Sequence, residues 1–133
     1  MGVGSHFVVV RLAGHEYAVA SRRIRGMMRM QGLDVTPVEA RGALRYLVQF
    51  GGRTLPVFVP NRRLGLKERP VSARSCLLLI GPKEDPEAVG CALMVDSISR
   101  VEEISPARHR PPDKVRLGDK WRSVLDVDRL CAA

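Results

Sequence analysis

The sequence has no long hydrophobic run, and its three cysteines stand far apart. No apolar stretch approaches the roughly 18 residues that a membrane-spanning helix needs. Arg11 interrupts the short apolar run near the N-terminus, so no secretory signal is predicted. The cysteines form no ligand spacing with the three histidines, and a metal site is therefore not expected. We expect a cytoplasmic protein without membrane insertion, whose thiols are reduced and buried: Cys76, Cys91 and Cys131.

Motifs that carry catalysis are also missing. The sequence has no Gly-x-Ser-x-Gly elbow, and it has no phosphate loop or dinucleotide fingerprint. Glu102 and Glu103 are adjacent on a predicted strand, so their side chains point to opposite faces. Asp126 and Asp128 are typical of a helix start, where the helix dipole favours negative charge. These observations predict no catalytic residue and no cofactor, and they favour a function in surface recognition.

Arginine is what the sequence has in abundance. The 133 residues carry a net charge of +8, and 18 of the 22 basic residues are arginine. Residues 1–66 hold ten arginines against three acidic residues, whereas residues 67–133 are nearly neutral at +1. Either the arginines form a solvated surface, or they form a basic face that pairs with carboxylates or phosphates. The predicted basic face consists of Arg22, Arg23, Arg25, Arg29, Arg41 and Arg45.

Short strands separated by turns dominate the hydrophobic pattern. Ser21 is predicted to cap a helical turn through Arg25, the dipeptide Thr36-Pro37 to begin a loop, and Asp126 to cap a short C-terminal helix. Pro106–Asp113, with three prolines, is predicted to be a loop. About ten strands and little helix predict an all-β barrel or sandwich. The predicted strands are 6–13, 16–20, 45–50, 53–59, 75–80, 88–95, 98–104 and 121–125, with 27–35 extended and hairpin turns at 51–52 and 118–119.

The order of these segments resembles a known family. An apolar strand is followed by the returning strand Glu16-Tyr17-Ala18-Val19. A central hairpin then contains Gly52, Pro56 and Val57, and a strand pair with a Val-Asp step and a Leu-Gly-Asp turn come after it. Together they resemble the CheW-like domain, the coupling module of bacterial chemosensory signalling. The segments that carry the resemblance are 7–14, 16–19, 21–28, 35–38, 47–66, 90–103, 117–119 and 124–130.

The resemblance implies one domain over residues 6–131. Its fold would be two Src-homology-3-like, five-stranded β-barrels sharing a core, with short helical turns and a short C-terminal helix. The first half-barrel would cover about 20–66 and the second about 75–125, in line with a faint repeat between 51–62 and 118–129. The implied function is a non-enzymatic adaptor in chemoreceptor arrays. Its partners would be a chemoreceptor signalling domain, the regulatory domain of the histidine kinase CheA and other CheW-like domains.

The resemblance also implies sites. Ile24 and Leu47 are either receptor-facing or core residues, and Tyr46 is expected to be exposed because it replaces a glycine. Gly26 stands where the family has a glutamate, and Val59-Pro60 replaces its Asp-Leu step, so kinase coupling is expected to be weak, with full coupling as the alternative. Gly51 stands where the family's hairpin has an arginine, which removes a donor from a surface that the family uses for partners. The implied receptor-binding residues are Ile24, Tyr46, Leu47, Gln49 and Gly51, and the kinase-face residues are Gly26, Val59 and Pro60.

A nucleic-acid-binding barrel is the alternative from another class. The +7 first half supports this alternative, because clustered arginines attract phosphates. The chain has only six aromatic residues, and single-strand binders stack bases on aromatic side chains. Nucleic acid is therefore the less favoured partner.

Overall fold

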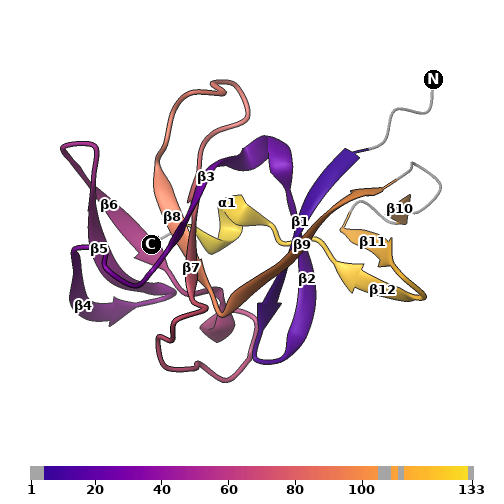
Figure 1. The fold of residues 1–133 in the computed structure, drawn as a ribbon, viewed down its shortest axis with the longest axis horizontal. Coiled ribbons are helices and arrows are strands. Elements are labelled where there is room, and N and C mark those ends of the chain that lie inside the picture. Colours follow the sequence, from indigo (N-terminus) through magenta and orange to yellow (C-terminus); the bar gives the residue numbers. More distant parts are fainter. Residues whose placement is uncertain (1–4, 105–108, 111–112, 132–133) are drawn as a thin grey trace.

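The computed structural model describes residues 5–104, 109–110 and 113–131. Within them the chain forms three antiparallel or mixed sheets, two short 3-10 turns and one short helix (Figure 1). None of the described helices is long and apolar enough to cross a membrane. The strands are β1 (Ser5–Leu12), β2 (His15–Ala20), β3 (Ile24–Arg29), β4 (Val35–Arg41), β5 (Leu44–Phe50), β6 (Arg53–Phe58), β7 (Cys76–Ile80), β8 (Cys91–Val95), β9 (Ser97–Ile104), β10 (His109–Arg110), β11 (Lys114–Leu117) and β12 (Lys120–Ser123), and the helical elements are η1 (Ser21–Arg23), η2 (Pro60–Arg62) and α1 (Val127–Leu130).

The largest sheet has six strands in the order β3-β7-β8-β6-β5-β4. Its strands pair antiparallel except β6 and β8, which run parallel. A second sheet has the order β2-β1-β9, and the third has the order β10-β11-β12. An isolated bridge between Ala18 and Val124 links the second and third sheets. In Figure 1 the six-stranded sheet lies on one side, the β10–β12 sheet on the other, and the β2-β1-β9 sheet between them.

Three strands are buried on both faces, which explains their uninterrupted apolar sequences. In β1, Phe7 and Val9 face one cluster while Val8 and Val10 face another. Strands β7 and β8 alternate in the same way between two clusters. The middle cluster, which we call the shared core, also takes in Leu125, Val127 and Leu130 from the C-terminal segment. One cluster lies within the six-stranded sheet, one between the β1–β9 and β11–β12 pairs, and the shared core joins them.

The all-β prediction with a shared core is confirmed, but the predicted halves are wrong. Strands β7 and β8 lie in the predicted second half, yet they pair with β3 and β6 of the first half. Their apolar side chains require neighbours on both faces. Other strands of the same sheet cover one face, and β1, β2 and the C-terminal segment cover the other. In the described part of the chain this sheet is not closed, because β3 and β4 are its two edges.

Local predictions had mixed outcomes. Asp126 does cap α1, because its side chain accepts a hydrogen bond from the Arg129 N–H. Ser21 is not a cap, since Ala20 takes that position and makes no side-chain bond. Thr36 and Pro37 lie inside β4, an edge strand that tolerates proline. The predicted 106–113 loop lies largely outside the described residues, apart from β10 and Asp113.

The cysteine prediction is confirmed in one respect and wrong in another. All three cysteines are free thiols, as expected. Cys91 is buried, but Cys76 and Cys131 are only half-buried. Cys76 lines the open hollow between β3 and β9, and Cys131 follows the last residue of α1.

Candidate interaction surface

An open groove lies between the β1–β9 pair and the edge formed by β3 and β7. Its position follows from the fold, because Cys76 and Ile98 pack against the shared core and also line the groove. We call it the inter-sheet groove. Four of its lining residues are arginines, and they come from four separate parts of the sequence. The groove is lined by Arg11, Arg29, Arg74, Cys76, Ser97, Ile98, Ser99 and Arg100.

Strand register explains how β3 presents its side chains to this groove. Directly paired antiparallel residues share one face of a sheet. Arg29 pairs with Cys76, and both line the groove. Ile24 and Met27 pair with residues of β7 that face the shared core, so they lie on the same face of β3 as Arg29. Met27 is 49% exposed, which gives this face an accessible apolar residue.

Two carboxylates balance part of the charge in the groove. Arg100 pairs with Glu16 at 2.9 Å and with Glu102 at 3.0 Å. The hydrogen bond to Glu16 raises the pKa of the Arg100 guanidinium above its usual value. Arg11 reaches Glu16 at 3.6 Å and donates to the Ser99 hydroxyl at 3.1 Å. Arg11 and Arg100 nevertheless keep 50% and 43% of their side-chain surface exposed.

The positive surface extends beyond the groove along the loop before β7. Arg74 and Arg11 also line a neighbouring hollow, together with Arg69 and Asp96. The two hollows thus present five guanidinium groups, while three carboxylates lie beside them. Such an excess of exposed arginine attracts an acidic surface and orients carboxylates through paired N–H donors.

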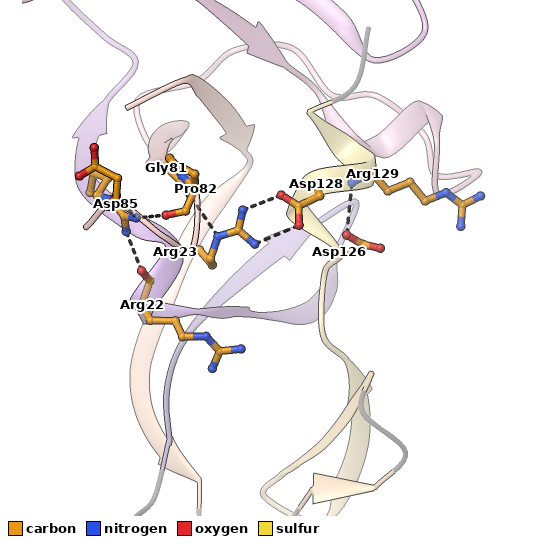
Figure 2. Close-up of polar contacts among 9 residues, drawn as sticks. Arg22, Arg23, Gly81, Pro82, Asp85, Asp126, Asp128 and Arg129 are labelled. Carbon is orange, nitrogen blue, oxygen red and sulfur yellow. Dashed lines mark hydrogen bonds and ion pairs between the residues drawn. The ribbon is translucent and has the colours of Figure 1, made fainter. Parts of the chain in front are cut away.

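A different arginine cluster lies at the other end of β3. Arg23 is buried, and Figure 2 shows its guanidinium between the Gly81 carbonyl and the Asp128 carboxylate of α1. Its Nη2 lies 2.5 Å from Asp128 Oδ1, and its Nε donates to the Gly81 oxygen at 2.9 Å. The hydrogen bond with Asp128 raises the pKa of Arg23, and the same bond lowers the pKa of Asp128. Arg23 therefore connects the start of β3 to the C-terminal helix.

Arg25 stabilises the 81–90 loop in a similar way. Its guanidinium donates to the backbone carbonyls of Pro82, Asp85 and Ala88. Gly81 is needed at the centre of this contact, because a Cβ there would lie 2.0 Å from the Ala88 oxygen and 2.6 Å from Arg25 Nε. We call Arg23, Arg25 and the groups that they bind the arginine clasp.

The predicted basic face is therefore wrong as a single surface. Arg23 is buried, and Arg25 is bound to backbone carbonyls. Arg45 keeps only 13% of its side chain exposed and pairs with Glu68 at 3.0 Å. Arg29 and Arg41 are exposed, but they lie on β3 and β4, the opposite edges of the six-stranded sheet. The sixth member, Arg22, is exposed on η1.

The structure separates the predicted receptor-binding residues into two places. Ile24 lies on the groove face of β3, packed against the shared core. Tyr46 is half-buried and packs against the cluster within the six-stranded sheet, so the prediction that it is exposed is wrong. Leu47 is half-buried, Gln49 is exposed and bonded to Thr54, and Gly51 forms the β5–β6 turn with positive φ.

The predicted kinase face is also covered. Val59 and Pro60 are buried, because the chain turns inward as β6 enters η2. Gly26 is half-buried, and a Cβ there would lie 3.2 Å from Leu79 Cδ1. A side chain at position 26 would therefore point toward the cluster within the sheet. The surface prediction is wrong for Val59 and Pro60.

Sequence reasoning missed the groove arginines on β1, on β9 and before β7. Arg11 is a single exposed position after a fully buried run in β1, whereas Arg100 lies among consecutive exposed residues of β9, so period-2 alternation marks neither residue. Arg11 and Arg100 are 89 positions apart in the sequence, and nothing local indicates that their strands pair. Nothing local indicates either that Arg74 lies across the groove from them.

Comparisons with known proteins agree with this fold. A family model of the CheW-like domain matches residues 6–130, so the chain belongs to the CheW-like domain family. This family consists of scaffolds and adaptors of chemotaxis signalling rather than enzymes. The crystal structure of the scaffolding protein TtCheW from Thermoanaerobacter tengcongensis is similar, with a TM-score of 0.79 and 17% identity over 98% of this chain and 89% of that chain. No curated protein sequence matches significantly.

Proposed function

We propose that this chain is a non-enzymatic adaptor of a cytoplasmic chemoreceptor array, and that its inter-sheet groove binds the receptor signalling domain. The observation that carries the proposal is the excess of exposed arginines over carboxylates in a groove that Ile98 also lines, with the exposed Met27 on the same face of β3 as Arg29. An apolar floor with a basic rim fits an amphipathic helix whose flank carries carboxylates. Membership of the CheW-like family supports a receptor as the source of that helix.

The test is binding of a fluorescent fragment of the receptor signalling domain. We expect the wild-type chain to bind at tens of micromolar or tighter. The double reversal Arg29→Glu/Arg74→Glu should weaken binding about tenfold, because it reverses two positive charges on the β3–β7 side of the groove. The matched control is Arg41→Glu/Arg53→Glu, which changes the net charge equally at exposed positions on β4 and β6.

The outcomes separate three explanations. A loss confined to the groove variant supports the proposal. An equal loss in both variants means that only net charge matters for binding. A loss confined to the control indicates that the β5–β6 hairpin with Gln49 and Gly51 binds the receptor fragment. Either result overturns the inter-sheet groove as the binding site. Absence of wild-type binding, with the protein folded, overturns the receptor as partner.

Nucleic acid is the competing partner for an arginine-lined groove. None of the described residues that line the groove is aromatic, so the groove offers no platform for stacking bases. We expect affinity for single-stranded DNA only at low salt, because phosphate contacts alone are lost as salt rises. DNA binding that persists at physiological salt would overturn this ranking.

We further propose that coupling to the regulatory domain of CheA is weak. The support is Gly26, which offers no carboxylate and whose missing side chain would point at Leu79. Val59 and Pro60 are buried and offer no surface either. Calorimetry with the isolated regulatory domain should show no binding at micromolar concentrations. Micromolar or tighter binding would contradict the proposal and favour a full receptor-to-kinase coupling protein.

A further inference from the structure

Two of the three cysteines meet at the C-terminal helix. Cys91 begins β8 and is 7% exposed, and Cys131 follows the last residue of α1 and is half-buried. Both pack against the shared core, and both line one hollow that opens to the surface beside Arg23 and Asp128. The two thiols also lie close enough for each to shift the pKa of the other. The fold thus brings together two thiols that are 40 positions apart in the sequence.

The surroundings make these two thiols unequal. The hydrogen bond from Cys131 lowers the pKa of Cys91, and the Arg23 guanidinium acts in the same direction against the effect of burial. The same hydrogen bond and burial raise the pKa of Cys131. A thiolate is the reactive form of cysteine, so we expect Cys91 rather than Cys131 to react first with an oxidant.

The third cysteine provides an internal comparison. Cys76 lies on β7 in the inter-sheet groove, and its Sγ donates to the Arg74 carbonyl at 3.3 Å. Burial raises the pKa of Cys76. It therefore shares partial exposure with Cys131 but has a backbone carbonyl as its partner.

We propose that Cys91 and Cys131 form a reversible disulfide when the protein meets hydrogen peroxide, and that this bond attaches the C-terminal helix to β8. The inference does not depend on the proposed adaptor function. Closure requires the two sulfurs, which line the same hollow, to approach to about 2.05 Å. Only one short element has to shift, because Cys131 ends a helix of four residues.

The reaction balances with peroxide as the oxidant. The Cys91 thiolate attacks one peroxide oxygen, the O–O bond breaks, and the leaving hydroxide takes up a proton to become water. Cys91 is then a sulfenic acid. The Cys131 sulfur attacks the Cys91 sulfur, the S–O bond breaks, and a second water leaves with the Cys131 proton. Two thiols lose two electrons, peroxide gains them, and a dithiol reductant reverses the bond by exchange.

The disulfide closes a loop of 40 residues and so restricts the unfolded chain. We expect the melting temperature to rise by about 10 °C on oxidation and to return on reduction. The same helix carries Asp128, so the disulfide would reinforce the Arg23–Asp128 pair that already holds this helix.

The experiment uses the full reduced chain at neutral pH with a small excess of hydrogen peroxide. Thiol titration and tryptic mass mapping follow the products. The expected product links the tryptic peptides 84–100 and 130–133, while peptide 75–83 keeps a free Cys76. In Cys131→Ser, Cys91 should stop at the sulfenic acid, which dimedone traps. The matched control Cys76→Ser should form the disulfide as the wild type does.

Three results would overturn the inference. The first is oxidation of Cys76 before Cys91, and the second is a disulfide between two chains as the main product. The third is loss of the Cys91 thiol in the wild type without a bond to Cys131. The disulfide between α1 and β8 would also be contradicted if oxidation raised the melting temperature of Cys131→Ser as much as that of the wild type.

Discussion

The inter-sheet groove and the arginine clasp use the same residue type for opposite purposes. In the clasp, Arg23 is buried and binds Asp128 and the Gly81 carbonyl, and Arg25 binds carbonyls of the 81–90 loop. In the groove, Arg11 and Arg100 have carboxylate partners but stay about half exposed. A count of arginines therefore says little about a binding surface until the internal partners of those arginines are known.

The clasp exists because the 81–90 loop has backbone carbonyls that no strand satisfies. Arginine suits this task, since its planar guanidinium carries five donors in a fixed arrangement. The groove has regular strands on both sides, whose backbone groups already pair within the sheets. Its guanidinium groups are only partly used within the fold, because Arg100 pairs with Glu16 and Glu102 and Arg29 donates to the Ala73 carbonyl at 3.1 Å, while both arginines stay exposed.

The largest effect should come from Gly81→Ala, which would disrupt the clasp at its centre. The new Cβ would lie 2.0 Å from the Ala88 oxygen, and a backbone atom cannot yield cheaply. We expect a loss of about 3 kcal/mol in the free energy of unfolding, measured in urea. Gly90→Ala is the control, because nothing lies within 4 Å of its Cβ. Equal losses in both variants would contradict the role of the clasp.

The next largest effect is expected for Arg23→Met, which keeps the buried volume but removes the donors. The Gly81 carbonyl and Asp128 lose their partner, and we expect a loss of about 2 kcal/mol in urea unfolding. Arg22→Met, at an exposed neighbouring position, should change stability by less than about 0.5 kcal/mol. If Arg22→Met were the more harmful change, the distinction between clasp and surface would fail.

A smaller effect is expected for Asp128→Asn, and it depends on pH. The pKa of Asp128 is lower in the folded protein, so its contribution is present above the unfolded pKa of about 3.9 and is lost as pH falls through the folded pKa. Because the Asp128 side chain is 67% exposed, we expect a loss of only about 0.5 kcal/mol at pH 7. The difference from wild type should shrink below pH 4. The control is Asp119→Asn, at an exposed turn residue. If the difference in the free energy of unfolding between Asp128→Asn and wild type did not depend on pH, the ion pair would not be its cause.

The smallest effect on stability is expected for Arg74→Ala in the groove. Arg74 is exposed and lines both hollows, so its loss should change the free energy of unfolding by less than about 0.5 kcal/mol. The same variant should slow association with the receptor fragment, and the slowing should fade as salt screens the charges. A large loss of stability would show that the groove arginines are structural, as the clasp arginines are.

Much of the fold could be predicted because its signals are local. The apolar runs of β7 and β8 indicated strands buried on both faces, Gly51-Gly52 indicated the β5–β6 turn, and Asp126 indicated the helix cap. Sheet order could not be predicted this way, because β6 and β8 pair in parallel across 34 intervening positions. Pro37 was misread for a related reason, since only an edge position makes proline acceptable in a strand.

The strands, the turns and the excess of arginine follow from the sequence alone, because alternation and turn chemistry act between near neighbours. Tertiary packing sets which arginines line an open groove and which hold the fold together. Arg23 and Arg29 lie six positions apart with equal charge, yet one meets Asp128 of the C-terminal helix and the other lines the groove. Burial and ion pairing depend on contacts between distant segments, and these contacts exist only once the sheets have packed.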